Sequence, residues 1–238
     1  SRTAVVFPFE EAIYERAHVP VSFVGHPLLD RIPAPGDMDE ERAAARERLG
    51  IPSGAWVALM PGSRHSEVSR ILPRLVGTAG RLAKRGVRFL LPLAPGLSRA
   101  DVEPHLAGSS LPIRIVEGAA YDCLRAADVA VVASGTATLE AALLGTPMVV
   151  VYRLNPLTYW FARMVVRVDH IAMANILAGR RLVPELIQGA ATPVRIAREV
   201  ERFLDEPAYA KATQRELLLL HEKLGSGGVA GRVAEIAT

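Results

Sequence analysis

Short apolar runs alternate with helical segments through the middle of the chain, and this alternation limits the possible folds more than any other feature. The run Trp56–Met60 is continuous and is closed by Pro61-Gly62, which is typical of a strand buried on both faces. Apolar residues then recur at helical spacing as far as Leu82, and Gly86 ends that helix. Further strands are expected near residues 87–93, 113–116, 129–132 and 147–152, separated by helices near 97–106, 121–126 and 137–144. Because such strands need crossover connections, the sequence predicts a doubly wound α/β domain with a parallel sheet.

Composition shifts predict three parts. Residues 1–30 hold two short apolar runs around a polar helical stretch, and we expect them to be the remnant of an amino-terminal domain and the start of a linker. The chain opens at Ser1 without methionine, so we expect it to be cut from a longer protein. Residues 31–190 are predicted to form the Rossmann-like domain. Residues 191–238 are predicted to be helices that pack back on the amino-terminal domain.

Charge and cysteine content argue against several classes of function. The 28 basic and 25 acidic residues leave a formal net charge of only +3, so nucleic-acid binding is not predicted. Cys123 cannot form an internal disulfide, and no histidine and cysteine cluster has the spacing of a zinc site, which favours a reducing cytoplasm without a metal. The most apolar stretch, 127–152, is interrupted by charged residues and glycine, so no membrane span is predicted.

The loop after the first buried strand is a candidate anion site. Gly62 lets the backbone approach a ligand closely, and the helix that follows is expected to present free N–H groups to it, beside Ser63. Arg64 could add a bidentate phosphate contact. An ordinary strand-to-helix turn, with Ser63 or Ser66 as the helix cap, explains the same residues equally well.

A second loop of small residues, Ser134-Gly135-Thr136, precedes a helix that carries Glu140 one turn in. Small residues let a ligand reach the helix amino terminus, and a carboxylate there could accept hydrogen bonds from a vicinal diol such as ribose. Capping by Ser134 or Thr136, with an acid complementing the helix dipole, is the alternative. Neither loop is a GxGxxG or Walker motif, which argues against dinucleotide redox chemistry and ATP hydrolysis.

The segment 153–167 mixes aromatic and basic residues. Arg153, Trp160, Phe161, Arg163 and Arg167 are candidates for contact with a membrane surface, as in helices that lie among lipid headgroups. A core-packing helix with arginines on its solvent side is the alternative.

Several motifs, in this order, resemble one enzyme family. They are Phe7-Pro8-Phe9-Glu10, Phe23-Val24-Gly25-His26, Pro61-Gly62-Ser63-Arg64, Ala133-Ser134-Gly135-Thr136, Pro147-Met148-Val149-Val150, and Asn175-Ile176-Leu177-Ala178-Gly179-Arg180 with Val183-Pro184-Glu185-Leu186 and Gln188. The set resembles lipid-A-disaccharide synthase, a metal-independent glycosyltransferase with two Rossmann-like domains facing a cleft (GT-B type). The resemblance spans nearly the whole chain and corresponds to the carboxyl-terminal, UDP-sugar-binding half.

The resemblance implies transfer of 2,3-diacylglucosamine from its UDP derivative to the 6-hydroxyl of 2,3-diacylglucosamine 1-phosphate. The products would be the β-1,6 lipid A disaccharide and UDP, and no cofactor would be needed. It implies that Arg64 and the backbone near Ser134 to Thr136 bind the diphosphate, that Glu140 binds the ribose, and that Asn175 and Arg180 belong to the donor site. The catalytic base would lie in the other half, so we expect this chain alone to bind UDP without turnover.

The acylated substrates imply peripheral contact with the inner face of the bacterial inner membrane. An exposed interdomain surface would favour a homo-oligomer. One departure from the family pattern is Ala174, where the family often has proline before the asparagine. Two alternatives stay open: another UDP-sugar enzyme, such as an undecaprenyl-linked N-acetylglucosaminyltransferase or an epimerase, and a noncatalytic nucleotide-binding module.

Overall fold

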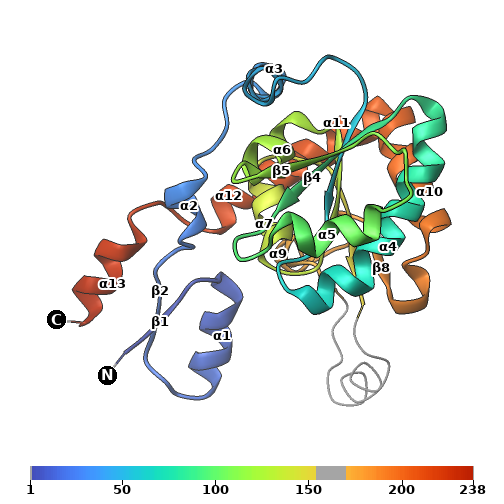
Figure 1. The fold of residues 1–238 in the computed structure, drawn as a ribbon. Helices are drawn as coiled ribbons and strands as arrows, with labels where there is room; N and C mark the ends of the chain where they lie inside the picture. The colour runs from blue at the N-terminus through green and yellow to red at the C-terminus, as the bar shows by residue number, and fades with distance from the viewer. Residues whose placement is uncertain (1, 154–169, 238) are drawn as a thin grey trace.

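The computed structural model describes residues 2–153 and 170–237, and its main body is built on a six-stranded parallel sheet (Figure 1). The strands are β3 (Trp56–Met60), β4 (Arg88–Leu93), β5 (Ile113–Glu117), β6 (Val129–Ala133), β7 (Met148–Tyr152) and β8 (Glu185–Ile187). Their order is β5-β4-β3-β6-β7-β8, and every neighbouring pair is parallel. The chain therefore runs outward from β3 on one side and then outward from β6 on the other. The prediction of a doubly wound α/β fold is confirmed.

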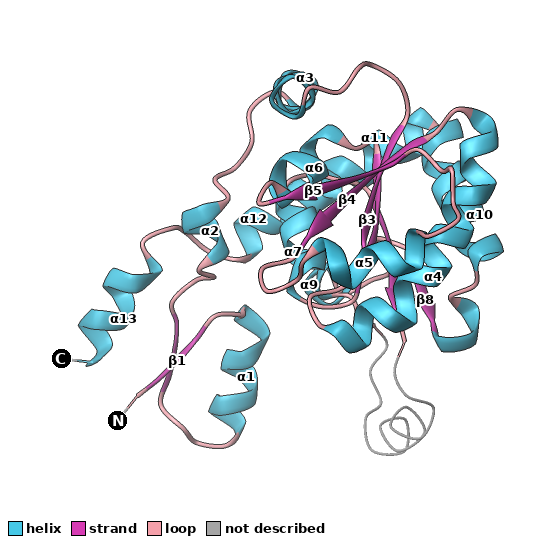
Figure 2. Ribbon diagram, viewed as in Figure 1, coloured by secondary structure: helices cyan, strands magenta, loops and turns pink. Residues whose placement is uncertain are grey.

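Helices cover both faces of this sheet (Figure 2). One face carries α4 (His65–Leu82), α5 (Arg99–Leu106) and α10 (Pro193–Asp205). The other carries α3 (Met38–Leu49), α6 (Ala120–Ala126), α7 (Thr136–Leu143), α9 (Met173–Ala178) and α12 (Leu220–Lys223), and α11 (Pro207–Leu218) packs on α10 and α7. Within β3, Val57 and Leu59 belong to the first face and Ala58 to the second, as the two-residue period of a strand requires. The central strands are thus buried on both sides.

A smaller unit lies beside this body. It contains the parallel pair β1 (Thr3–Val5) and β2 (Val21–Phe23) with α1 (Pro8–Arg16), followed by α2 (Leu28–Arg31), and α13 (Val229–Ala237) lies alongside (Figure 1). Arg232 on α13 donates from Nε to the carbonyl oxygen of Val24 at 2.9 Å, and the carboxylate of Asp30 accepts from the backbone N–H of Gly228. These hydrogen bonds hold the amino-terminal segment and the segment of α13 against each other.

The carboxyl-terminal helices divide between the two units. Ile196, Val200 and Phe203 of α10 are buried in the core of the sheet, whereas α13 contacts the amino-terminal segment. The domain boundaries at residues 30 and 190 stay predictions.

The strands and helices expected in the main body are all present, and their ends differ from the expected ones by a few residues. Helix α4 begins at His65. The short helix α9 and the three-residue strand β8 are among the elements that were not expected. Among the described residues, no helix is both long and apolar enough to span a membrane.

Candidate functional site

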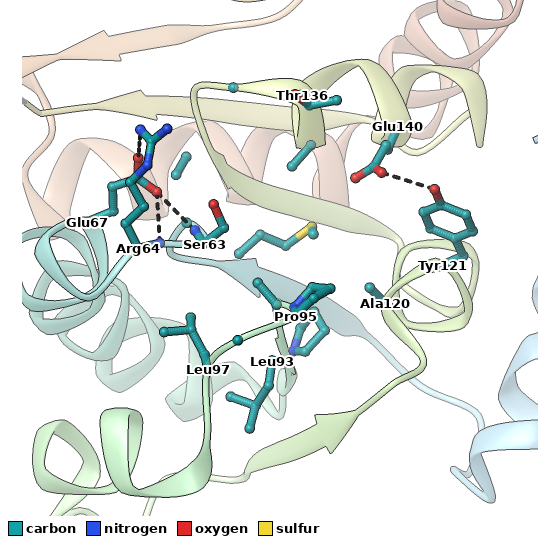
Figure 3. Close-up of a pocket in the computed structure, with 18 of the residues that line it drawn as sticks. Ser63, Arg64, Glu67, Leu93, Pro95, Leu97, Ala120, Tyr121, Thr136 and Glu140 are labelled. Carbon is teal, nitrogen blue, oxygen red and sulfur yellow. Dashed lines mark hydrogen bonds and ion pairs between the residues drawn. The ribbon is translucent and has the colours of Figure 1, made fainter. Parts of the chain in front are cut away.

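A cavity of about 830 Å³ opens at the carboxyl edge of the sheet, within the size range of small-molecule sites (Figure 3). Its walls come from the segments that follow β3, β4, β5 and β6. β3 and β6 are neighbours, and the chain leaves them in opposite directions. Ligands of open parallel sheets bind at such a switch point. The cavity thus lies where the fold class predicts a ligand, and both loops singled out from the sequence line it.

The first loop holds an arginine at one end of the cavity. Gly62 has a φ of +115°, in the region that favours glycine, and a Cβ at this position would lie 2.3 Å from Oε2 of Glu67. Arg64 lies beside this glutamate, with its Nη1 3.4 Å from Oε1, and its side chain is 80% exposed. The guanidinium is therefore placed at the cavity wall with little burial and one weak partner (Figure 3).

The N–H groups before the helix and those of its first turn differ in their partners. The carboxylate of Glu67 accepts from the N–H of Ser63 at 2.9 Å and from that of Arg64 at 3.4 Å. Neither serine is the helix cap, because Arg64 is the N-cap residue, and Glu67 at the third helical position accepts from the N–H of that residue. These two N–H groups already have an acceptor, whereas those of His65 and Ser66, the first two residues of α4, have none among the described residues. Among the residues of this loop that line the cavity, the arginine side chain is the group best suited to an anion.

The second loop leaves its helix terminus open. The N-cap residue of α7 is Gly135, no side chain caps the helix, and the first turn contains no acid. The N–H groups of Thr136 and Ala137 have no acceptor among the described residues, and both residues line the cavity. Ser134 Oγ donates instead to the carbonyl oxygen of Ile171 at 3.4 Å. An uncapped amino terminus carries partial positive charge, so this end of α7 is suited to an anion.

Glu140 lies at the other end of the cavity from Arg64 (Figure 3). It is half-buried, and its Oε1 accepts from the hydroxyl of Tyr121 on α6 at 3.0 Å. Burial and the nearby Glu140 charge raise the pKa of Tyr121, so this hydroxyl stays protonated at neutral pH and acts as the donor. The second carboxylate oxygen of Glu140 has no hydrogen bond or ion pair with the rest of the described chain. The arrangement can accept a further hydrogen bond from a ligand.

Sequence analysis missed other residues in the cavity wall. Tyr121 and Arg31 both line it, the latter from α2 in the segment between the two units. Two more carboxylates in the wall are already paired: Glu117 with Arg99 at 2.9 Å and Asp122 with Arg48 at 2.6 Å. No local motif marks these residues, because they come from separate segments of the chain that only the fold brings together.

Two predicted donor-site residues lie outside this cavity. Asn175 is fully buried, its Nδ2 donates to Val183 O at 2.9 Å and Glu185 Oε1 at 2.8 Å, and its Oδ1 accepts from the N–H groups of Leu182 and Val183 at 2.7 and 2.8 Å. Its four contacts pin the segment before β8. Arg180 pairs with Glu216 at 2.6 Å in a separate groove, beyond the amino-terminal end of β8.

The network around Asn175 reaches the cavity only indirectly. Glu185 also accepts from the N–H groups of Ile171 and Ala172, and the Ile171 carbonyl receives the Ser134 hydroxyl. Asn175 thus supports the loop at Ser134 through Glu185 and Ile171, and it does not line the cavity itself.

The membrane-contact candidates fall mostly beyond the structure. Trp160, Phe161, Arg163 and Arg167 lie outside the described residues. Arg153 is described, and its Nη1 is 3.5 Å from the carbonyl oxygen of Gln188. No group of histidine, cysteine, aspartate and glutamate with the arrangement of a metal site occurs in residues 2–153 and 170–237.

Comparison with known proteins decides the family. Residues 2–228 match the family described as lipid-A-disaccharide synthetase. The chain belongs to the lipid-A-disaccharide synthetase family. Lipid-A-disaccharide synthase of Geobacter metallireducens is 49% identical over 99% of the chain, and that of Geobacter sulfurreducens is 47% identical over the same share. The family resemblance drawn from the motifs is confirmed.

Solved structures of other proteins share the fold of this member of the lipid-A-disaccharide synthetase family. A glycosyltransferase from Rickettsia africae superposes with a TM-score of 0.64 at 13% identity, covering all of this chain and 62% of that one. UDP-GlcNAc 2-epimerase from Neisseria meningitidis, solved with UDP-GlcNAc, gives 0.65 at 15% identity, covering 99% of this chain and 61% of that one. These likenesses show a fold shared with GT-B glycosyltransferases. The chain spans 61% of the length of each of the two Geobacter relatives.

Proposed function

We propose that this chain is the donor-binding part of a lipid-A-disaccharide synthase and that UDP-2,3-diacylglucosamine binds in the cavity between α4 and α7. The observation that carries the proposal is the convergence of three groups on one cavity: the Arg64 guanidinium, the uncapped amino terminus of α7 and the Glu140 carboxylate. Two of these attract an anion and the third accepts hydrogen bonds. A nucleoside diphosphate carries the matching features, a diphosphate and a ribose diol.

The positions of the groups suggest how UDP would be oriented. The ribose would meet Glu140, and the diphosphate would extend along the α7 terminus toward Arg64, which lies at the far end of the cavity (Figure 3). The N–H groups of Thr136 and Ala137 would then donate to phosphate oxygens. Gly62, Ser63 and Gly135 would contribute by leaving space rather than by side-chain contact. Asn175 and Arg180 would support the donor site through neighbouring segments.

The proposed reaction places these groups on the leaving side. The bond from the sugar anomeric carbon to the β-phosphate oxygen breaks, and a bond forms from that carbon to the 6-hydroxyl oxygen of 2,3-diacylglucosamine 1-phosphate. The hydroxyl proton passes to a general base, which we expect in the part of the relatives that this chain does not span. Negative charge grows on the departing UDP while the sugar becomes oxocarbenium-like. Arg64 and the α7 terminus would stabilise that charge without a metal.

The acyl chains of both substrates suggest where the enzyme works. We propose peripheral association with the inner face of the inner membrane, with the segment 153–167 as the contact. Arg153 supports this placement, because it follows β7 at the same edge of the sheet as the cavity. A homo-oligomer stays a prediction.

Calorimetric titration with UDP in metal-free buffer tests the proposal. We expect saturable binding by the native chain and at least about tenfold weaker binding by Arg64→Ala and Glu140→Ala, since each removes a charged contact. Arg198→Ala and Glu222→Ala are matched controls, because both residues are exposed and neither lines the cavity. Failure of the folded native chain to bind UDP would contradict the proposal, as would equal losses in the control variants.

A further inference from the structure

Tyr121 is the one side chain, within the described part of the chain, that donates a hydrogen bond to Glu140. The two residues lie on different helices, α6 and α7, and 19 positions apart in sequence. Both line the cavity, and Figure 3 shows the phenol pointing at the carboxylate. The contact therefore depends on the packing of α6 against α7 rather than on local sequence.

The geometry of this contact leaves Glu140 only partly occupied. The Tyr121 hydroxyl meets Oε1 at 3.0 Å, and Oε2 has no partner among the described residues. An ionised carboxylate has about four acceptor positions, so one donor from Tyr121 leaves the others for a ligand. A glutamate side chain that is free to rotate loses conformational entropy when it binds, and a fixed one has less to lose.

We propose that Tyr121 is a positioning residue: it holds the Glu140 carboxylate where it accepts hydrogen bonds from both hydroxyls of a ribose, and so selects a ribonucleoside diphosphate over its 2′-deoxy form. This inference rests on the proposed function, because it assigns the ribose to Glu140. Tyr121 itself need not touch the ligand. Tyr121 is expected to affect nucleotide affinity only through Glu140, whose second carboxylate oxygen meets the ribose diol.

The test compares UDP with 2′-deoxy-UDP by calorimetry. Tyr121→Phe keeps the ring and removes the hydroxyl, and it is expected to weaken UDP binding about five- to tenfold, the effect of losing one hydrogen bond to a charged group. Binding of 2′-deoxy-UDP is expected to weaken less than binding of UDP, because only the 3′-hydroxyl remains to meet the positioned carboxylate. The selectivity between the two nucleotides therefore falls.

Tyr209→Phe is the matched control. The Tyr209 ring stacks on Phe203 with centroids 4.8 Å apart, lies under the Arg202 guanidinium, and is outside the cavity. Its hydroxyl donates to no described residue, so this variant is expected to bind both nucleotides as the native chain does. Urea unfolding of each variant shows whether the fold is kept.

A second variant separates positioning from structure. In a Glu140→Ala background, Tyr121→Phe is expected to change UDP affinity by less than about twofold, since the partner it positions is gone. The inference alone would be overturned if Tyr121→Phe weakened UDP binding as much in the Glu140→Ala background as in the native one. It would also be overturned if the single variant lost equal affinity for UDP and 2′-deoxy-UDP, or kept its native affinity for UDP. Absence of UDP binding by the folded native chain would overturn the proposed function and this inference together.

Discussion

Replacing Asn175 with alanine is expected to destabilise the protein strongly, although the residue lies outside the cavity. The side chain is fully buried and makes four hydrogen bonds between 2.7 and 2.9 Å. Alanine would leave the N–H groups of Leu182 and Val183 without their acceptor and remove a donor from Glu185. Each unsatisfied buried group costs about 1–3 kcal/mol, and the losses overlap because water can enter the space. We expect a loss of about 3–5 kcal/mol in the free energy of unfolding.

The assay is urea unfolding followed by circular dichroism, with UDP titration of the folded variant. Gln214→Ala is the control, since Gln214 makes one part-buried hydrogen bond to Gly145 O at 2.9 Å and its loss should cost about 1 kcal/mol. UDP affinity of folded Asn175→Ala is expected to fall less than about threefold, because the network reaches Ser134 only through a hydrogen bond of 3.4 Å. A stability loss below about 1 kcal/mol together with loss of UDP binding would refute this reasoning and favour direct contact with the donor.

Gly62→Ala is expected to lose about 1–3 kcal/mol in urea unfolding, because φ is +115° and the added Cβ would collide with Glu67; an unchanged midpoint would contradict the loop geometry. Burial lowers the pKa of His26, whose Nδ1 accepts from the N–H of Leu28, so its contribution is present above about pH 6.5 and declines as pH falls toward the folded-state pKa. The free energy of unfolding of His26→Asn should therefore fall less steeply than that of the native chain between about pH 7 and 5.5. The same slope in both proteins would contradict a lowered His26 pKa. Burial raises the pKa of Cys123 to about 12, so a thiol reagent at about pH 8 should label it only after unfolding, and rapid labelling of the native chain would contradict its burial.

The main sheet could be predicted because its strands are marked by sequence. Trp56–Met60 and Val129–Ala133 are short apolar runs between helical segments, and burial on both faces requires that pattern. Strand β8 lacks such a mark, because Glu185–Ile187 is only three residues long and begins with an acid. Glu185 accepts hydrogen bonds from backbone N–H groups and from Asn175, so its role depends on tertiary contacts that the local sequence does not show.

The candidate site was predictable in part for the same reason. Gly62 and Arg64 lie in the loop after β3, and Glu140 lies one turn into the helix after β6, so all three are near strand ends, where the fold class places ligands. Glu67 could not be read as the acceptor for the first loop, because a glutamate three residues into a helix fits either a capping role or a solvent-facing one. Tyr121 had no signal at all, since its partner is 19 residues away and on another helix.

A crystal structure of this chain with UDP tests the central claim most directly. The account predicts UDP in the cavity at the carboxyl edge of the sheet, with the ribose hydroxyls on Glu140 and the diphosphate between the α7 amino terminus and Arg64. UDP ordered instead in the groove lined by Arg180 and Arg202, with this cavity empty, would contradict the account.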